Sequence, residues 1–138
     1  MEQRDYLLRQ IQMMAQVIAA LVRKLMGLKE QGTEEEIVQV TDEMLTEYFD
    51  TSLVEIVQTP LEKTVEQMIQ NKKLHPSNVD LFAEVLMINA DKSEYAANRK
   101  KLLERALILL EWVDKTGGVF SAERRQKIVD IRQKLEEL

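Results

Sequence analysis

The residues best suited to chemistry in this chain are carboxylates spaced about one helical turn apart. Glu43, Glu47 and Asp50 follow one another in a segment whose apolar spacing is helical. On a helix that spacing places all three side chains on one face, where their oxygens suit a hard divalent cation. Di-iron helical proteins use inward-facing Glu-x-x-His pairs, and the sequence contains none. Because these acids point away from the apolar side, we expect a solvated acidic face; a small-ligand or divalent-cation site is the alternative.

Residues for nucleophilic or phosphate chemistry are scarce. The chain has no cysteine, which excludes disulfides, zinc-thiolate sites and iron-sulfur clusters. Its single histidine, His75, precedes Pro76 in a predicted turn, where we expect it to act as a turn or cap residue. The four glycines match neither phosphate-binding fingerprint. We therefore predict no enzymatic activity, no cofactor and no metal site.

The net charge of −5 is concentrated in one part of the chain. Residues 30–62 carry ten acidic and no basic side chains, whereas both flanking regions are slightly basic. Basic clusters at residues 99–101 and 124–127 have acids close by in the sequence, and the isoelectric point is near 5.0. Nucleic-acid binding is not expected from this balance, because phosphate contacts need an excess of basic side chains.

The first residues do not have the layout of a signal peptide, because Arg9 interrupts the apolar stretch and no small-residue cleavage site follows. The uncharged run from Gln10 to Val22 contains three glutamines. It is shorter than the ~20 apolar residues that span a bilayer. We expect a cytoplasmic protein with no membrane contact.

Apolar spacing along the chain predicts one all-α domain over residues 1–138 with five or six helices. The start and stop signals are an Asp5 cap, a capping box at Thr33 and Glu36, and caps at Ser93 and Ser121. Gly27 or Gly32 is expected to end the first helix, and Pro60 to open a third main helix. The expected helices are 5–26, 33–49, 60–69, 76 or 77–89, 94–115 and 121–138, with at most a short helix at 53–57.

Three short segments carry a resemblance to a known family: DYLLRQI at residues 5–11, LMGL at 25–28 and EEEI at 34–37. They are similar to a bacterial domain-of-unknown-function family of short helical proteins, along much of the chain. The resemblance implies a tetratricopeptide-like helical fold and brings no assigned biochemical activity.

A second resemblance is to the tetratricopeptide repeat, and it rests on a pair of neighbouring helices. The chain departs from the repeat at Met87 and Arg99, where glycine and alanine are preferred, and no second copy follows at a period of about 34 residues. The resemblance implies antiparallel hairpins in a right-handed superhelical array, without peptide-binding residues. The matching positions are Leu86, Leu103, Ala106 and Leu107.

Partner binding is the leading functional hypothesis. Tyr6, Met13 and Val17 lie beside the main apolar stripe of the first helix, and Ile108 and Trp112 lie opposite the core side of the fifth. A noncatalytic interaction or scaffold module would use such surfaces for a protein partner or for self-association, whereas coverage by a neighbouring helix is the alternative. The acidic side chains of the second helix complete the candidate set: Glu35, Asp42, Glu43, Glu47 and Asp50.

Overall fold

The computed structural model describes residues 2–138, and every regular element within that range is helical. The all-α prediction is therefore confirmed. Short 3-10 or π segments at Leu61–Lys63, Glu66–Asn71 and Pro76–Asn78 join the longer elements. The α-helices are α1 (Glu2–Gln31), α2 (Glu34–Phe49), α3 (Leu53–Gln58), α4 (Val79–Lys92), α5 (Ala96–Thr116) and α6 (Ala122–Glu136).

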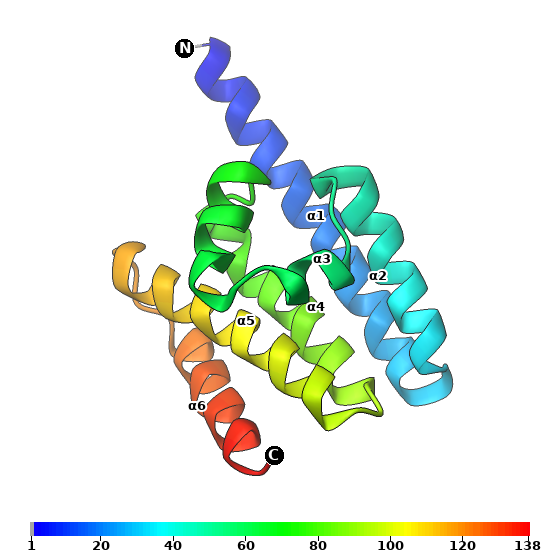
Figure 1. Cartoon of the computed structure of the whole chain (residues 1–138). Helices are drawn as coiled ribbons and strands as arrows, with labels where there is room; N and C mark the ends of the chain where they lie inside the picture. The colour runs from blue at the N-terminus through cyan, green and yellow to red at the C-terminus, as the bar shows by residue number, and fades with distance from the viewer. Residues whose placement is uncertain (1) are drawn as a thin grey trace.

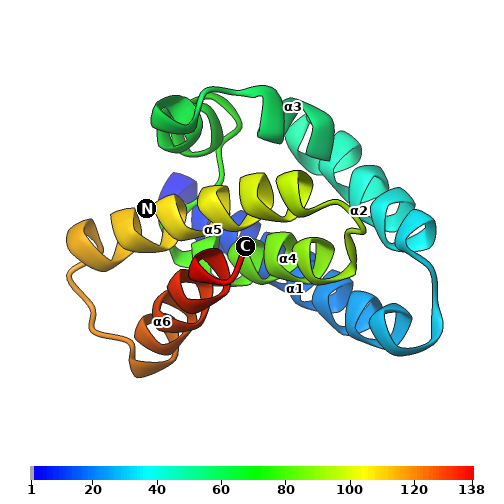
Figure 2. The ribbon, with the colours of Figure 1, turned by 60° about the horizontal axis from the view of Figure 1, so that its bottom comes forward.

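The central element is α4, which α1, α2 and α5 contact directly. In Figure 1, α1 and α2 run side by side in opposite directions, and α5 runs back along α4. Figure 2 shows α6 crossing on the side of α4 and α5 away from α3. Phe82 of α4 is fully buried and meets Phe49 of α2 edge to face, with 5.7 Å between ring centroids. The core therefore forms around α4.

The first helix begins before its predicted cap and ends just before Gly32, the second of the two glycines expected to end it. It begins at Glu2, before the expected Asp5 cap, and it continues through Gly27 to Gln31, with Gly32 directly after it. Gly27 faces open space, so it interrupts no packing. One glycine inside a helix costs only about 1 kcal/mol, and the buried Leu25 next to it holds the helix together.

Two other helix starts differ from expectation. Pro60 is the capping residue before the 3-10 segment Leu61–Lys63 and is not the first residue of a helix. The expected third helix over residues 60–69 then continues as a π-helix at Glu66–Asn71. The fifth helix begins at Ala96, after Tyr95, so the Ser93 cap was wrong. The hydroxyl of Ser93 instead accepts a hydrogen bond from Asn98 Nδ2 at 2.9 Å, a side-chain donor in place of a backbone amide.

The caps at Thr33, Ser121 and His75 are confirmed, but the Glu36 half of the capping box is not. The Thr33 hydroxyl accepts from the Glu36 amide at 3.2 Å, and the Ser121 hydroxyl accepts from the Arg124 amide at 3.1 Å. The Glu36 carboxylate accepts from the Thr33 hydroxyl at 3.3 Å, whereas the capping box predicted a bond to the Thr33 amide. His75 is a cap residue as expected, since its Nδ1 accepts from the Ser77 amide at 3.2 Å.

Ion pairs fasten α6 to both of its neighbours. Arg124 donates to both carboxylate oxygens of Asp80 on α4, at 2.8 and 3.1 Å, and lies 3.6 Å from Asp114 on α5. The hydrogen bonds to Asp80 raise the pKa of Arg124, although burial opposes the shift. Arg124 is therefore a fixed cation at the junction of three helices.

A second carboxylate joins the first and last helices. Asp91, at the end of α4, accepts from Lys29 of α1 at 2.8 Å and from Lys134 of α6 at 3.0 Å. Burial alone would raise the pKa of Asp91, but the hydrogen bonds from the two lysines outweigh it and the pKa lies below its ordinary value. The charged form of Asp91 therefore stabilises the packing of α1 and α6 against α4.

Candidate protein-interaction surface

The apolar stripe of α1 extends past the body of the molecule. Ile18, Leu21 and Leu25 are buried against the other helices. At the same three- and four-residue spacing toward the N-terminus, Met14 is half-buried and Leu7 is 56% exposed. Figure 1 shows why, since the first turns of α1 project beyond the neighbouring helices. The same stripe is thus core over its second half and surface over its first half.

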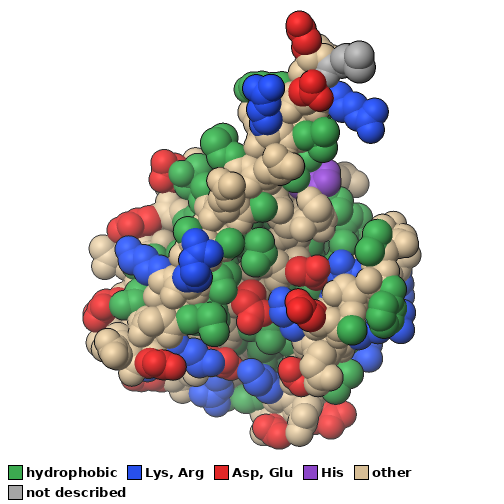
Figure 3. Space-filling model, turned by 180° about the vertical axis from the view of Figure 1, so that it is seen from behind, with side chains coloured by type: hydrophobic (Ala, Val, Ile, Leu, Met, Phe, Trp, Pro, Cys, Tyr) green, Lys and Arg blue, Asp and Glu red, His purple; other side chains and the backbone are tan. Residues whose placement is uncertain are grey.

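A groove runs beside this projecting part of α1, and we call it the N-terminal groove. Leu7, Ile11 and Met14 form one wall, Tyr48 and Phe49 at the end of α2 form another, and residues 69–78 close it. Its volume is about 630 Å³. Figure 3 shows charged side chains at the tip of the projecting helix and hydrophobic side chains at its surface beside and below them.

The walls of the N-terminal groove are held by hydrogen bonds and by buried anchors. Asn78, only 3% exposed, donates from Nδ2 to the backbone oxygen of Ile11 at 3.2 Å and ties the 76–78 segment to α1. Leu74 is 1% exposed and fixes the middle of the closing segment. Lys72 Nζ donates to the backbone oxygen of Asp50 at 2.7 Å, which joins the segment to the end of α2. The groove is therefore formed by ordered elements.

The polar side chains at the N-terminal groove are basic or neutral. Lys72, Lys73 and His75 line it, and none of the described residues that line it is acidic. Lys73 has φ +62°, the left-handed region that glycine usually occupies. In a chain with a net charge of −5, this groove is apolar with a basic edge.

The three residues expected to be available on α1 have different environments. Tyr6 is 62% exposed and Met13 is 60% exposed. Met13 lines the N-terminal groove, and Tyr6 lies one turn before Gln10, another lining residue, whose side-chain amide donates to the Tyr6 hydroxyl at 2.9 Å. Val17 is half-buried and packs against the core. Met13 thus lines the groove, Tyr6 is bonded to a lining residue without lining the groove itself, and Val17 belongs to the margin of the core.

The acidic residues of α2 do not lie at this groove. Glu35, Glu43, Glu47 and Asp50 are exposed. Asp42 is half-buried and accepts a hydrogen bond from the amide of Leu53 at 2.8 Å, so it holds the start of α3. Within residues 2–138 no three His, Asp or Glu side chains lie close enough to hold a metal ion together. The acidic face therefore supplies charge at the surface, and one of its acids fixes a turn.

The apolar side of α5 faces another part of the chain. Ile108 and Trp112 are half-buried, and Trp112 packs against the core. Arg105 lies on the same side of α5 and is buried; its guanidinium donates to the backbone oxygen of Thr59 at 2.9 Å. The segment that follows α3 therefore lies over this side of α5. As a result, α5 carries no exposed apolar stripe.

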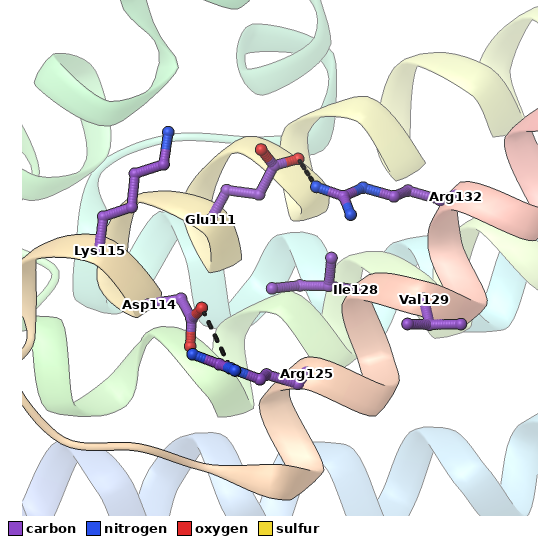
Figure 4. A pocket seen from close by; sticks show the side chains of 7 residues that line it. All are labelled: Glu111, Asp114, Lys115, Arg125, Ile128, Val129 and Arg132. Carbon is purple, nitrogen blue, oxygen red and sulfur yellow. Dashed lines mark ion pairs between the residues drawn. The ribbon is translucent and has the colours of Figure 1, made fainter.

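A smaller cavity of about 270 Å³ lies between α5 and α6. Figure 4 shows that two ion pairs border it, Asp114 with Arg125 and Glu111 with Arg132, each at 3.6 Å. Its carboxylates already face guanidinium groups of the same chain. This arrangement fastens α6 to α5.

Sequence reasoning missed most of the N-terminal groove. Leu7, Ile11 and Tyr48 lie on the apolar faces of their helices, so the pattern assigned them to the core. Ile69 and Lys72 come from a segment distant in sequence from α1. The one available signal was the unusual width of the apolar side of α1, roughly 200° on a helical projection, which exceeds what one neighbouring helix covers.

The helix α1 is long and apolar enough to cross a membrane by length and composition, and 17% of its most apolar 18-residue window is buried. Buried helices of soluble proteins and N-terminal signal sequences meet the same criteria.

Comparison of the chain with models of protein families, with curated proteins and with solved structures finds no match.

Proposed function

We propose that this protein is a noncatalytic protein-protein interaction module that binds its partner in the N-terminal groove. The observation that carries the proposal is the uncovered continuation of the α1 stripe, where Leu7 and Met13 are more than half exposed beside an ordered apolar groove. Contiguous apolar surface of this kind marks interaction sites, because exposing it to water is unfavourable.

The chemistry of the groove suits an amphipathic helix. Helices bind in apolar grooves through side chains spaced three and four residues apart, and the groove walls here are themselves helical. Met13 and Met14 add flexible, polarizable contacts that adapt to a partner surface. The edge formed by Lys72 and Lys73 favours acidic side chains beside the apolar face of the bound helix.

The wider setting of the proposal is a cytoplasmic bacterial scaffold whose helical hairpins are arranged like tetratricopeptide repeats. The repeat-like arrangement is supported by the packing of α4 against α5, in which Leu86, Leu103 and Ala106 are buried as the repeat pattern requires. The acidic side chains of α2 have no role in this proposal, because none of them lines the N-terminal groove.

Site-specific photo-cross-linking in cells of the source organism tests the proposal. A photoreactive phenylalanine at Met13 should form covalent adducts with protein, because position 13 lines the groove. The matched control is Val129, which is 54% exposed on α6 and away from the groove. Adducts at position 13 and none at 129 support the proposal. Absence of protein adducts at position 13, or equal yields at both positions, refutes it.

A further inference from the structure

We propose that the occupant of the N-terminal groove is a second copy of this chain, with the two α1 helices packed against each other about a two-fold axis. The inference rests on the proposed function and names the partner. In such a dimer each projecting α1 lies in the groove of the other copy. A two-fold pair is the most common form of protein self-association, since one surface serves as both halves of the interface.

The distribution of exposed apolar side chains on α1 favours this occupant over a foreign helix. Leu7 continues the core stripe and lines the groove with Met13, whereas Tyr6 and Leu8 lie on the two sides of Leu7 and are not lining residues. A foreign helix in the groove contacts the groove-facing side of α1. In a two-fold dimer, α1 also enters the opposite groove, so a second flank is covered by the partner's closing segment. Tyr6 and Leu8 are 62% and 49% exposed, so the sides of α1 outside its own groove also need coverage.

Charge is consistent with the same arrangement. The groove edge carries Lys72 and Lys73, with no acidic lining residue among those described. On α1, Glu2 lies one turn before Tyr6 and on the same flank. The projecting turns of α1 also carry Asp5, Arg4 and Arg9, so their acidic and basic side chains balance and do not oppose entry beside the basic edge. They also bring Tyr6 and Met13, residue types that interfaces favour.

Sedimentation equilibrium of the purified full chain tests this inference. The unsubstituted protein should be a dimer, and Leu7→Glu and Met13→Glu should each make it monomeric with an unchanged helical circular dichroism spectrum. Val119→Glu and Val129→Glu are matched controls, because they add the same charge at positions 72% and 54% exposed outside the groove. A chain that is monomeric at its highest soluble concentration overturns the inference, as does a dimer that the control substitutions dissociate and the groove substitutions do not.

The absence of cysteine makes a second measurement direct. Met13→Cys treated with a short bismaleimide should give a cross-linked dimer, and Val129→Cys should not. The reverse pattern overturns the inference without any assumption about stability. A monomeric chain that binds anionic phosphatidylglycerol vesicles through Leu7 also overturns it, and assigns α1 to a membrane surface.

The two proposals fail in distinguishable ways. If position 13 photo-cross-links to other proteins while the purified chain stays monomeric, the second copy is excluded and the interaction module stands. If position 13 forms adducts with neither a second copy nor another protein, both proposals fall. Adducts with the mass of two chains support both.

Discussion

Replacing Arg124 with methionine should be among the most destabilising single changes in α6. The Arg124 side chain is 10% exposed, and it faces carboxylates on two other helices, Asp80 and Asp114, whose side chains are 33% and 20% exposed. It also donates to the backbone oxygen of Val119 at 3.2 Å. Methionine keeps the aliphatic stem, so the change removes the charge and the hydrogen bonds while preserving most of the packing.

The free-energy cost of Arg124→Met depends on the carboxylates that lose their partner. Removing one partner of a buried ion pair costs about 3 to 5 kcal/mol, because the remaining charge stays partly desolvated. Asp80 keeps a third of its exposure to water, which places the expected cost of Arg124→Met near the lower end, about 3 kcal/mol. For a chain of this length that corresponds to a fall in Tm of roughly 10 °C.

Thermal and urea unfolding followed by circular dichroism measures this effect, with Arg132→Met as the control. Arg132 is 58% exposed and lies 3.6 Å from Glu111, so its loss should cost less than about 1 kcal/mol. The double variant Arg124→Met with Asp80→Leu should recover part of the loss, since it no longer leaves Asp80 charged and unpaired. Equal costs for Arg124→Met and Arg132→Met would refute the reasoning.

Three further substitutions test the packing and the pH dependence. Because the folded pKa of Asp91 lies below its unfolded value, the stabilisation that its charged form provides is present above about pH 4 and is lost as the pH falls through the folded pKa. In urea unfolding, Asp91→Asn should therefore have a lower free energy of unfolding than the unsubstituted chain at pH 7, and the difference should narrow at pH 3. A difference that stays constant with pH would contradict the pairing. Ala106→Leu should cost roughly 1 to 3 kcal/mol, because Ala106 is 0% exposed where α5 meets the core. Glu43→Gln should change the free energy of unfolding by about half a kcal/mol or less. Thermal melts in which Glu43→Gln lowers Tm more than Ala106→Leu does would reject the assigned helix faces.

Local signals in the sequence predicted the helix boundaries that depend on neighbours three or four residues away. Thr33, Ser121 and His75 cap their helices because each acceptor atom reaches an amide within the same short segment. At Ser93 the hydroxyl accepts instead from the side chain of Asn98 in the following helix, which begins at Ala96. Cap chemistry is thus readable where one donor is available and ambiguous where two compete.

The candidate site was only partly predictable, because its location depends on where the body of the molecule stops. Tyr6 and Met13 were identified from the width of the apolar side of α1. Leu7 has the same periodicity as the buried Leu25, so periodicity alone assigns both to the core. Trp112 illustrates the converse, since the segment that lies over that side of α5 is distant in sequence. Such differences arise from tertiary packing, which a one-dimensional pattern does not contain.

The two lysines on Asp91 make that carboxylate a spectroscopic reporter of whether the last helix is docked. One oxygen faces Lys29 of α1 and the other faces Lys134 of α6, so detachment of α6 removes one cation and leaves the other in place. The carboxyl carbon-13 resonance would then titrate at a higher pH, closer to that of an ordinary aspartate. A single nucleus at the end of α4 would thus follow, in solution and without a label on α6, how the C-terminal part of the chain associates with the N-terminal helix.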